Sequence, residues 1–76
     1  MSIIDDLADA LARDTIAAAE EMGDENLISD VCKQLAATST TMEEAYLTSI
    51  RVRLSEQRAR KYLVERMATG KAASAS

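Results

Sequence analysis

Residues 40–54 read TTMEEAYLTSIRVRL, and this stretch decides the fold of the chain. An apolar residue stands at every fourth position, namely at Met42, Tyr46, Ile50 and Leu54. This spacing keeps the four side chains on one face of an α-helix. Thr40 and Glu43 fit the capping box that opens a helix, and no helix breaker follows before Gly70. The stretch therefore predicts a long helix over residues 41–69, about 43 Å from end to end.

Two shorter helices are expected before this long one. Ser2 can cap the first helix, whose acidic first turn suits the positive end of the helix dipole, and Gly23 can take the left-handed conformation that ends it. This helix is predicted over residues 3–22. Its apolar face is expected to consist of Ile4, Leu7, Leu11, Ala18 and Met22. Asp24 can cap a second helix over residues 25–37.

The composition predicts an all-α fold. The 76 residues contain no Pro and only two Gly, while helix-favouring residues such as Ala, Leu and Glu are abundant. Residues 1–69 are expected to form one helical domain, and residues 70–76, GKAASAS, a flexible tail. In a three-helix hairpin or bundle, the second helix spans only about half of the third. Because a chain this short gains stability from association, we expect the uncovered part to pack on a second copy, forming a helical homodimer.

The long helix is expected to supply the residues through which two copies associate. These association residues are Tyr46, Ile50, Leu54, Leu63 and Met67. Polar side chains interrupt the apolar pattern between Leu54 and Leu63, which disfavours a long uninterrupted coiled coil. A break of the helix at Ser55, which can cap a new helix, is left open by the sequence.

Charged residues on otherwise apolar helix faces indicate ion pairs. In the long helix, the apolar stripe would pass through Arg53 and Arg60 on its way to Leu63. In the first helix, Asp14 points within about 40° of Leu7 and Ala18 at 100° per residue. We therefore predict that Asp14 pairs with Arg53 and Arg60, within one chain or across the dimer, and that these pairs fix the register of packing.

Several kinds of chemistry are disfavoured. The sequence has no His, one Cys and no glycine-rich phosphate-binding motif, so it lacks the commonest general base and the usual zinc ligands. The pairs Asp6–Asp9 and Glu21–Asp24 have the spacing of magnesium ligands, but they stand at helix ends, where acids stabilise the helix. Cys32 lies beside apolar residues and is expected to be packed and unreactive. We assign no catalytic, cofactor-binding or metal-binding residue, and a carboxylate-dependent metal enzyme is the weakest alternative.

Charge is divided unevenly along the chain, whose net charge is −4. Residues 1–30 contain nine acids and one Arg, whereas residues 31–76 contain eight basic residues and four acids. The basic residues concentrate in RVRLSEQRARK, residues 51–61. On a helix they form two rows, with Arg51 and Arg58 facing away from the apolar side and Arg53 and Arg60 near it. This division argues against one broad cationic face for phosphates.

These observations favour a small non-enzymatic protein that binds another protein, as a regulator or adaptor. The expected partner-binding residues are Arg51, Arg58 and Lys61. Because Arg makes fork-shaped contacts with carboxylates, the expected partner has an acidic surface, either on another protein or on this chain itself. The alternative is nucleic-acid binding by the same helix, which the negative net charge and the absence of aromatic residues in the basic stretch disfavour.

The sequence also bears on where the protein acts. No apolar run approaches the roughly 20 residues of a membrane span, and the first residues lack the basic start of a signal peptide. One Cys permits no intramolecular disulfide. We therefore expect a soluble, unprocessed, cytoplasmic protein that does not bind membranes.

Overall fold

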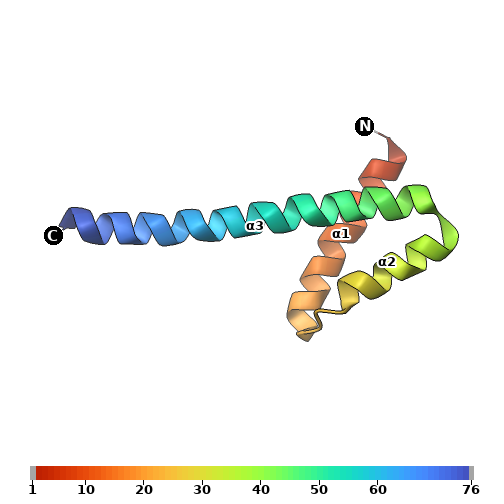
Figure 1. The fold of residues 1–76 in the computed structure, drawn as a ribbon, viewed down its shortest axis with the longest axis horizontal. Helices are drawn as coiled ribbons and strands as arrows, with labels where there is room; N and C mark the ends of the chain where they lie inside the picture. The colour runs from red at the N-terminus through yellow and green to blue at the C-terminus, as the bar shows by residue number, and fades with distance from the viewer. Residues whose placement is uncertain (1, 76) are drawn as a thin grey trace.

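The computed structural model describes residues 2–75, and it describes side chains for residues 2–70. The described residues form three α-helices, α1 (Ile3–Met22), α2 (Leu27–Thr38) and α3 (Thr40–Ala75), so the prediction of an all-α fold is confirmed (Figure 1). Residues 2–75 contain no β-strand. In the same part of the chain, no helix joins the length and the apolar character that crossing a bilayer requires.

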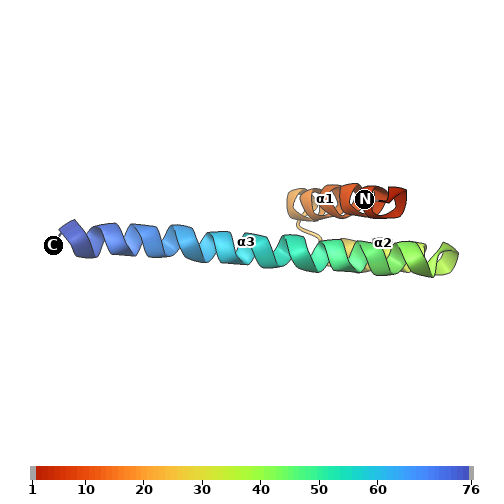
Figure 2. The same ribbon diagram turned by 90° about the horizontal axis from the view of Figure 1, so that it is seen from above.

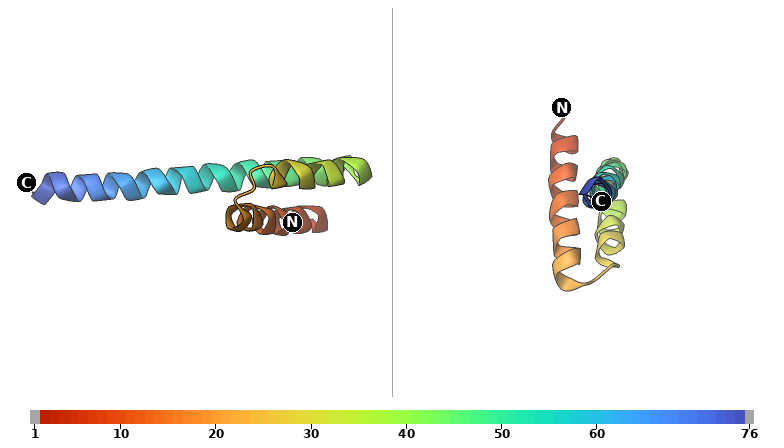
Figure 3. Two further views of the ribbon diagram at one scale, coloured as in Figure 1. Left: turned by 90° about the horizontal axis from the view of Figure 1, so that it is seen from below. Right: turned by 90° about the vertical axis from the view of Figure 1, so that its left-hand side faces the viewer.

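The helices lie in two layers. Figure 2 shows α1 in one layer and α2 beside the first part of α3 in the other, and the right-hand view of Figure 3 shows the same two layers from the end of the molecule. The principal extents are 57 × 30 × 13 Å. The molecule is long because α3 continues far beyond the other two helices (Figure 1).

Local signals set both ends of α1. The Ser2 side chain accepts a hydrogen bond from the backbone N–H of Asp5, at 3.2 Å. At the other end, Gly23 takes the left-handed conformation with φ 66°, and the backbone N–H of Asp24 donates to the carbonyl of Ala19 at 3.0 Å. These bonds satisfy backbone groups that a helix end leaves free. The predicted bounds of α1, residues 3–22, are confirmed.

The starts of α2 and α3 differ from the prediction by a short distance. The Asp24 carboxylate accepts a hydrogen bond from the Asn26 N–H at 3.0 Å, so it forms a turn before α2 instead of capping it, and α2 begins at Leu27. The residue that caps α3 is Ser39, whose hydroxyl accepts from the Met42 N–H at 3.2 Å. The predicted capping box of Thr40 and Glu43 is therefore wrong. Ser caps a helix somewhat better than Thr, and Ser39 has the extended backbone of an N-cap residue.

α3 is one continuous helix. It passes Ser55 without a break, which answers the question that the sequence left open. It also passes Gly70, where the sequence predicted its end at Thr69. A Gly inside a helix costs only about 1 kcal/mol relative to Ala, so it ends a helix only where the chain must turn. The predicted flexibility of residues 70–76 stays a prediction, and side chains beyond Gly70 lie outside the described residues.

The core lies where α1 crosses α3. Its buried residues are Ala8, Ala12 and Ile16 of α1 with Tyr46 and Ile50 of α3. Tyr46 is fully buried, and its hydroxyl donates a hydrogen bond of 2.9 Å to the backbone carbonyl of Ile28 in α2. Burial raises the pKa of Tyr46, which keeps the hydroxyl a donor. Because an unpaired buried hydroxyl costs about 1–3 kcal/mol, this bond permits an aromatic core and ties α2 to it.

α1 buries a different face from the one that its large apolar residues predicted. The buried face consists of Ala8, Ala12, Thr15, Ile16 and Ala19, whereas Leu7 and Met22 are 55% and 65% exposed. α3 presents Tyr46 at the crossing, and small side chains opposite it let the two helices approach until water is excluded. Thr15 is tolerated there because its hydroxyl donates to the Leu11 carbonyl at 2.7 Å. The predicted face of α1 is therefore wrong by a rotation of the helix.

Much apolar surface stays uncovered in the single chain. α2 has no buried residue, and every residue from Ser55 to Gly70 in α3 is exposed. The exposed large apolar residues are Ile3, Leu7, Met22, Val52, Tyr62, Leu63, Val64 and Met67. The accessible surface is 5748 Å², against about 4,500 Å² for a compact monomer of this mass. The surface beyond the helix crossing is thus available to bind something else.

The two glycines provide a matched pair of substitutions, because neither has an atom within 4 Å of the place where a Cβ would stand. Gly23→Ala should lower the free energy of unfolding by about 1–2 kcal/mol, since Ala is strained in the left-handed conformation. Gly70→Ala should not destabilise the protein and should favour the helix by up to about 1 kcal/mol. Urea unfolding followed by circular dichroism measures both, and equal effects of the two substitutions would contradict the assigned backbone geometry.

Candidate interaction surface

The charged contact between α1 and α3 is an ion pair of Arg53 with Asp9. The Nε and one terminal nitrogen of the guanidinium each donate to a different carboxylate oxygen of Asp9, both at 2.8 Å. The side chains remain 33% and 50% exposed, respectively. Because the contact is bidentate, it restricts the orientation of α1 relative to α3 as well as joining opposite charges.

The sequence predicted Asp14 in this place, and the structure shows Asp9 instead. Asp14 contacts the neighbouring Arg13 at 3.2 Å on the exposed side of α1, and Arg60 contacts Glu56 at 2.6 Å along α3. Within one chain, Asp14 does not reach Arg53, because the prediction rested on another face of α1 than the one that packs on α3. Asp9 lies within about 20° of the buried Ile16 on a helical wheel, so a correct choice of face would have found it. Pairing of Asp14 or Arg60 across a dimer stays a prediction.

The ion pair shifts both titrating groups toward their charged forms. The side-chain hydrogen bond from Arg53, aided by its charge, holds the pKa of Asp9 below its ordinary value against the opposing effect of desolvation. The hydrogen bond to Asp9 likewise raises the pKa of Arg53. The folded state therefore favours the ionised Asp9, which links stability to pH.

The three predicted partner-binding residues lie along α3. We call Arg51, Arg58 and Lys61 the basic row, and all three are exposed. At 100° per residue, Arg51 and Arg58 lie within about 20° of each other. Among residues 2–70, no carboxylate forms an ion pair with any member of the row. The row therefore presents three cations whose charge is not neutralised by a contact within the described chain.

The predicted association residues divide into two groups. Tyr46 and Ile50 are buried in the chain's own core, and Leu54 packs against that core. These three residues serve the fold of a single chain. Leu63 and Met67 are each 53% exposed on the uncovered part of α3. Only this second group is free to contact another molecule.

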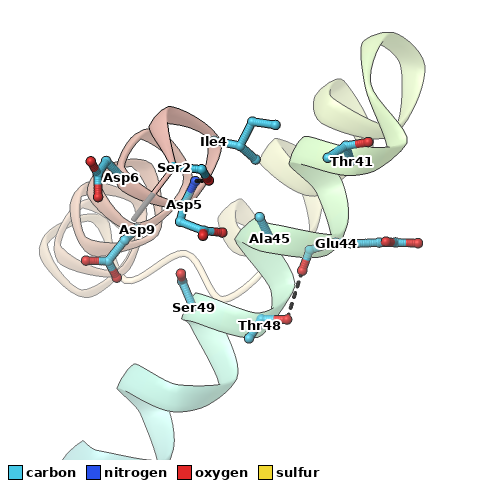
Figure 4. Close-up of a pocket in the computed structure, with 10 residues that line it drawn as sticks. All are labelled: Ser2, Ile4, Asp5, Asp6, Asp9, Thr41, Glu44, Ala45, Thr48 and Ser49. Atoms are coloured by element: carbon cyan, nitrogen blue, oxygen red, sulfur yellow. Dashed lines mark hydrogen bonds between the residues drawn. The ribbon is translucent and has the colours of Figure 1, made fainter.

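Open hollows flank the crossing of α1 and α3. Figure 4 shows the one at the start of α1, of about 560 Å³, where Asp5 points toward α3 and Asp6 points away. Another of about 550 Å³ lies where α3 leaves the core, with an apolar floor that includes Ile16 and Leu54 and with Arg58 at its edge. Neither encloses a ligand-sized space from solvent, and each is a shallow surface feature.

In each acidic pair that was considered as a set of magnesium ligands, one carboxylate already binds another group of the chain. Asp9 binds Arg53, and the Asp24 carboxylate accepts a backbone hydrogen bond. Within the described residues, no three acidic or cysteine side chains are grouped closely enough to hold a metal ion.

Cys32 lies on α2 and packs against the core. Its thiol donates a hydrogen bond to the Glu43 carboxylate at 3.8 Å. Burial raises the pKa of the Cys32 thiol, and the negative charge of Glu43 raises it further. Since the thiolate is the reactive form, this environment opposes reaction at neutral pH.

Comparison with known proteins gives no relative. No protein-family model matches the chain, and neither curated proteins nor solved structures gave a match. The function is therefore inferred from the geometry and charge of the α3 surface.

The Arg53–Asp9 pair predicts a pH dependence of stability. A lowered pKa in the folded state means that the contribution of Asp9 is present above its ordinary value of 3.8 and is lost as the pH falls below it. Asp9→Asn should therefore destabilise the protein at pH 7, and the gap to wild type should close in acid. Urea unfolding across this pH range measures it. Asp14→Asn is the control, with a smaller gap at pH 7, because its pair is exposed.

The environment of Cys32 predicts slow reaction with a disulfide reagent. At pH 7 the folded protein should react more slowly than a free thiol, and Glu43→Gln should speed the reaction because it removes a negative charge beside the sulfur. The absorbance of the coloured thiolate that Ellman's reagent releases follows the rate. Protein unfolded in urea gives the reference rate, and a folded protein that reacts faster than this reference would contradict the assigned environment.

Proposed function

We propose that this chain is a non-enzymatic protein–protein interaction module, a small regulator or adaptor that acts as a homodimer in the cytoplasm. Its binding surface is the basic row of α3, Arg51, Arg58 and Lys61. The partner is a protein whose surface carries carboxylates.

A single observation carries this proposal: three exposed cations stand along α3 without an ion-pair partner among the described residues. Arg53 lies on another side of α3, within reach of an acid of α1, and it donates two hydrogen bonds to Asp9. The basic row lacks any such contact within residues 2–70. The acidic first helix therefore neutralises only one Arg of α3 through an ion pair, and the row stays available.

The geometry of the row suits recognition of carboxylates. Arg51 and Arg58 stand seven residues apart, about 10.5 Å along a continuous helix. The helix fixes this spacing before binding, which reduces the entropy lost when a partner binds. Two guanidinium groups at a set spacing discriminate between acidic surfaces better than a flexible basic segment does, because each can bind a carboxylate through two bonds.

Exposed apolar residues support self-association. Leu63 and Met67 lie on α3 beyond the helix crossing, together with Tyr62 and Val64. A helix that projects alone into water is only marginally stable, and burying these side chains on a second chain stabilises it. The excess of accessible surface over a compact monomer points the same way.

The test compares capture of a specific protein from cell extract by the wild type and by the Arg51→Glu, Arg58→Glu double variant. The expected result is one captured protein with the wild type and at least a roughly tenfold loss with the variant, because two positive charges at the contact become negative. Arg13→Glu, Lys33→Glu is the matched control, since it makes the same change of net charge at exposed positions on α1 and α2. Equal capture by the row variant, or equal loss in the control, would sink the proposal.

A titration with random DNA and RNA at two salt concentrations separates the nucleic-acid alternative. Repulsion from the acidic residues of α1 should keep binding weak at physiological salt. Tight binding that falls steeply with salt and depends on Arg51 and Arg58 would replace the protein partner with a nucleic acid.

A further inference from the structure

A second surface on α3 lies on a different side of the helix from the basic row. We define the α3 seam as six residues at alternating spacings of four and three, namely Val52, Glu56, Ala59, Leu63, Arg66 and Gly70. All six are exposed. This spacing is the repeat by which two α-helices pack along their length. On a helical wheel the seam lies about 130° from the mean direction of the basic row, Arg51, Arg58 and Lys61.

We propose that the α3 seam binds the α3 seam of a second copy of this chain, with the two helices antiparallel. This inference rests on the self-association that the proposed function includes, and it specifies the surface, the direction and the register.

Charge decides the direction. In a parallel pair, each seam residue meets its own copy, so Glu56 would face Glu56 and Arg66 would face Arg66. Like charges placed opposite each other destabilise a helix pair. In an antiparallel pair centred on Lys61, Glu56 stands level with Arg66 of the second copy, since both are five residues from the centre. The two-fold symmetry repeats this attractive contact, and Lys61 itself points away from the seam.

Size decides the register. Centring on Lys61 also sets Ala59 against Leu63 of the second copy and Val52 against Gly70, so that each large apolar side chain of the seam meets a small residue. Gly70 has open space around it, with no atom within 4 Å of where a Cβ would stand. A shallow hollow of about 260 Å³, lined by Glu56, Ala59, Arg60 and Leu63, lies at the middle of the seam. It offers room for Leu63 of the second copy.

The existing ion pair on α3 fits this arrangement. Glu56 already binds Arg60 of its own chain at 2.6 Å. In the antiparallel pair, the Glu56 carboxylate would lie between Arg60 of its own chain and Arg66 of the second copy, so it would have two cationic neighbours. The seam runs over 19 residues, about 27 Å, and leaves the crossing of α1 with α3 intact.

A second copy is the occupant because the seam is complementary to itself. Opposite charges face each other, and large apolar residues face small ones, when α3 packs antiparallel on a second α3. Such self-complementarity is what a two-fold dimer requires of a surface. The basic row points away from the seam, so the dimer presents two rows to partners.

Sedimentation equilibrium of charge-swapped variants tests the direction. Glu56→Arg alone and Arg66→Glu alone should each raise the dimer dissociation constant by about tenfold or more, because each places like charges opposite each other twice. The double variant Glu56→Arg, Arg66→Glu should restore dimerisation, since it exchanges the two partners. A parallel pair gives the opposite pattern, in which neither single variant weakens association. Arg58→Glu is the matched control outside the seam and should leave the dimer unchanged.

Cysteine cross-linking tests the register independently. In a Cys32→Ser background, mixing Ala59→Cys chains with Leu63→Cys chains should give disulfide-linked heterodimers in large excess over linked homodimers. Preferred homodimers would overturn the antiparallel register. Every substituted seam residue is exposed, so the variants should keep their helices. Circular dichroism of each variant checks this.

The outcomes separate this inference from the proposed function. If the charge swaps leave the dimer dissociation constant unchanged, the seam is overturned while the proposed self-association stands. A wild type that stays monomeric at the highest soluble concentration overturns both the seam and the self-association. Neither result affects capture of an acidic partner, because that experiment reads the basic row on another side of α3.

Discussion

The fold depends on one aromatic residue packed against a face of small ones. Tyr46 fills the crossing of α1 and α3, and it can do so because alanines at positions 8 and 12 leave room opposite it. Its hydroxyl then reaches the Ile28 carbonyl, so the same residue that separates the layers also holds α2 in place. Every other feature follows from this crossing, because the angle of α1 determines which acid meets Arg53 and how much of α3 is left free.

The sequence predicted the helices better than their packing, for a physical reason. Ser2 and Gly23 act on their own helix through local hydrogen bonds, so the bounds of α1 could be predicted from neighbouring residues. The buried face of α1 could not, because it depends on the size of Tyr46, which is distant in sequence. Hydrophobicity alone selected Leu7 and Met22, while the demand for close approach selected alanines. Gly70 was overestimated as a stop, since a Gly ends a helix only when the chain needs to turn there.

The candidate surface was predictable to the extent that helix periodicity determines it. Exposure of Arg51 and Arg58, and the placement of Arg53 near the apolar side, follow from 3.6 residues per turn. The acid that binds Arg53 depends on the rotation of α1, so it was missed. Tyr46 and Ile50 were assigned to association because they belong to the apolar stripe of the long helix, but a small core needs them first. What remains for contact between chains is the later part of α3.

The absence of any buried residue in α2 has a consequence for motion on slow timescales. Its apolar residues pack against the core but are only partly buried, and two side-chain hydrogen bonds join it to α3, the one from Tyr46 to Ile28 and the weak one between Cys32 and Glu43. Among the helices that build the core, α2 should therefore detach by local unfolding at the lowest free energy, and its amide hydrogens should exchange before those of α1. Any residual modification of Cys32 would then report how often α2 opens, which makes this thiol a built-in reporter of a partly unfolded state.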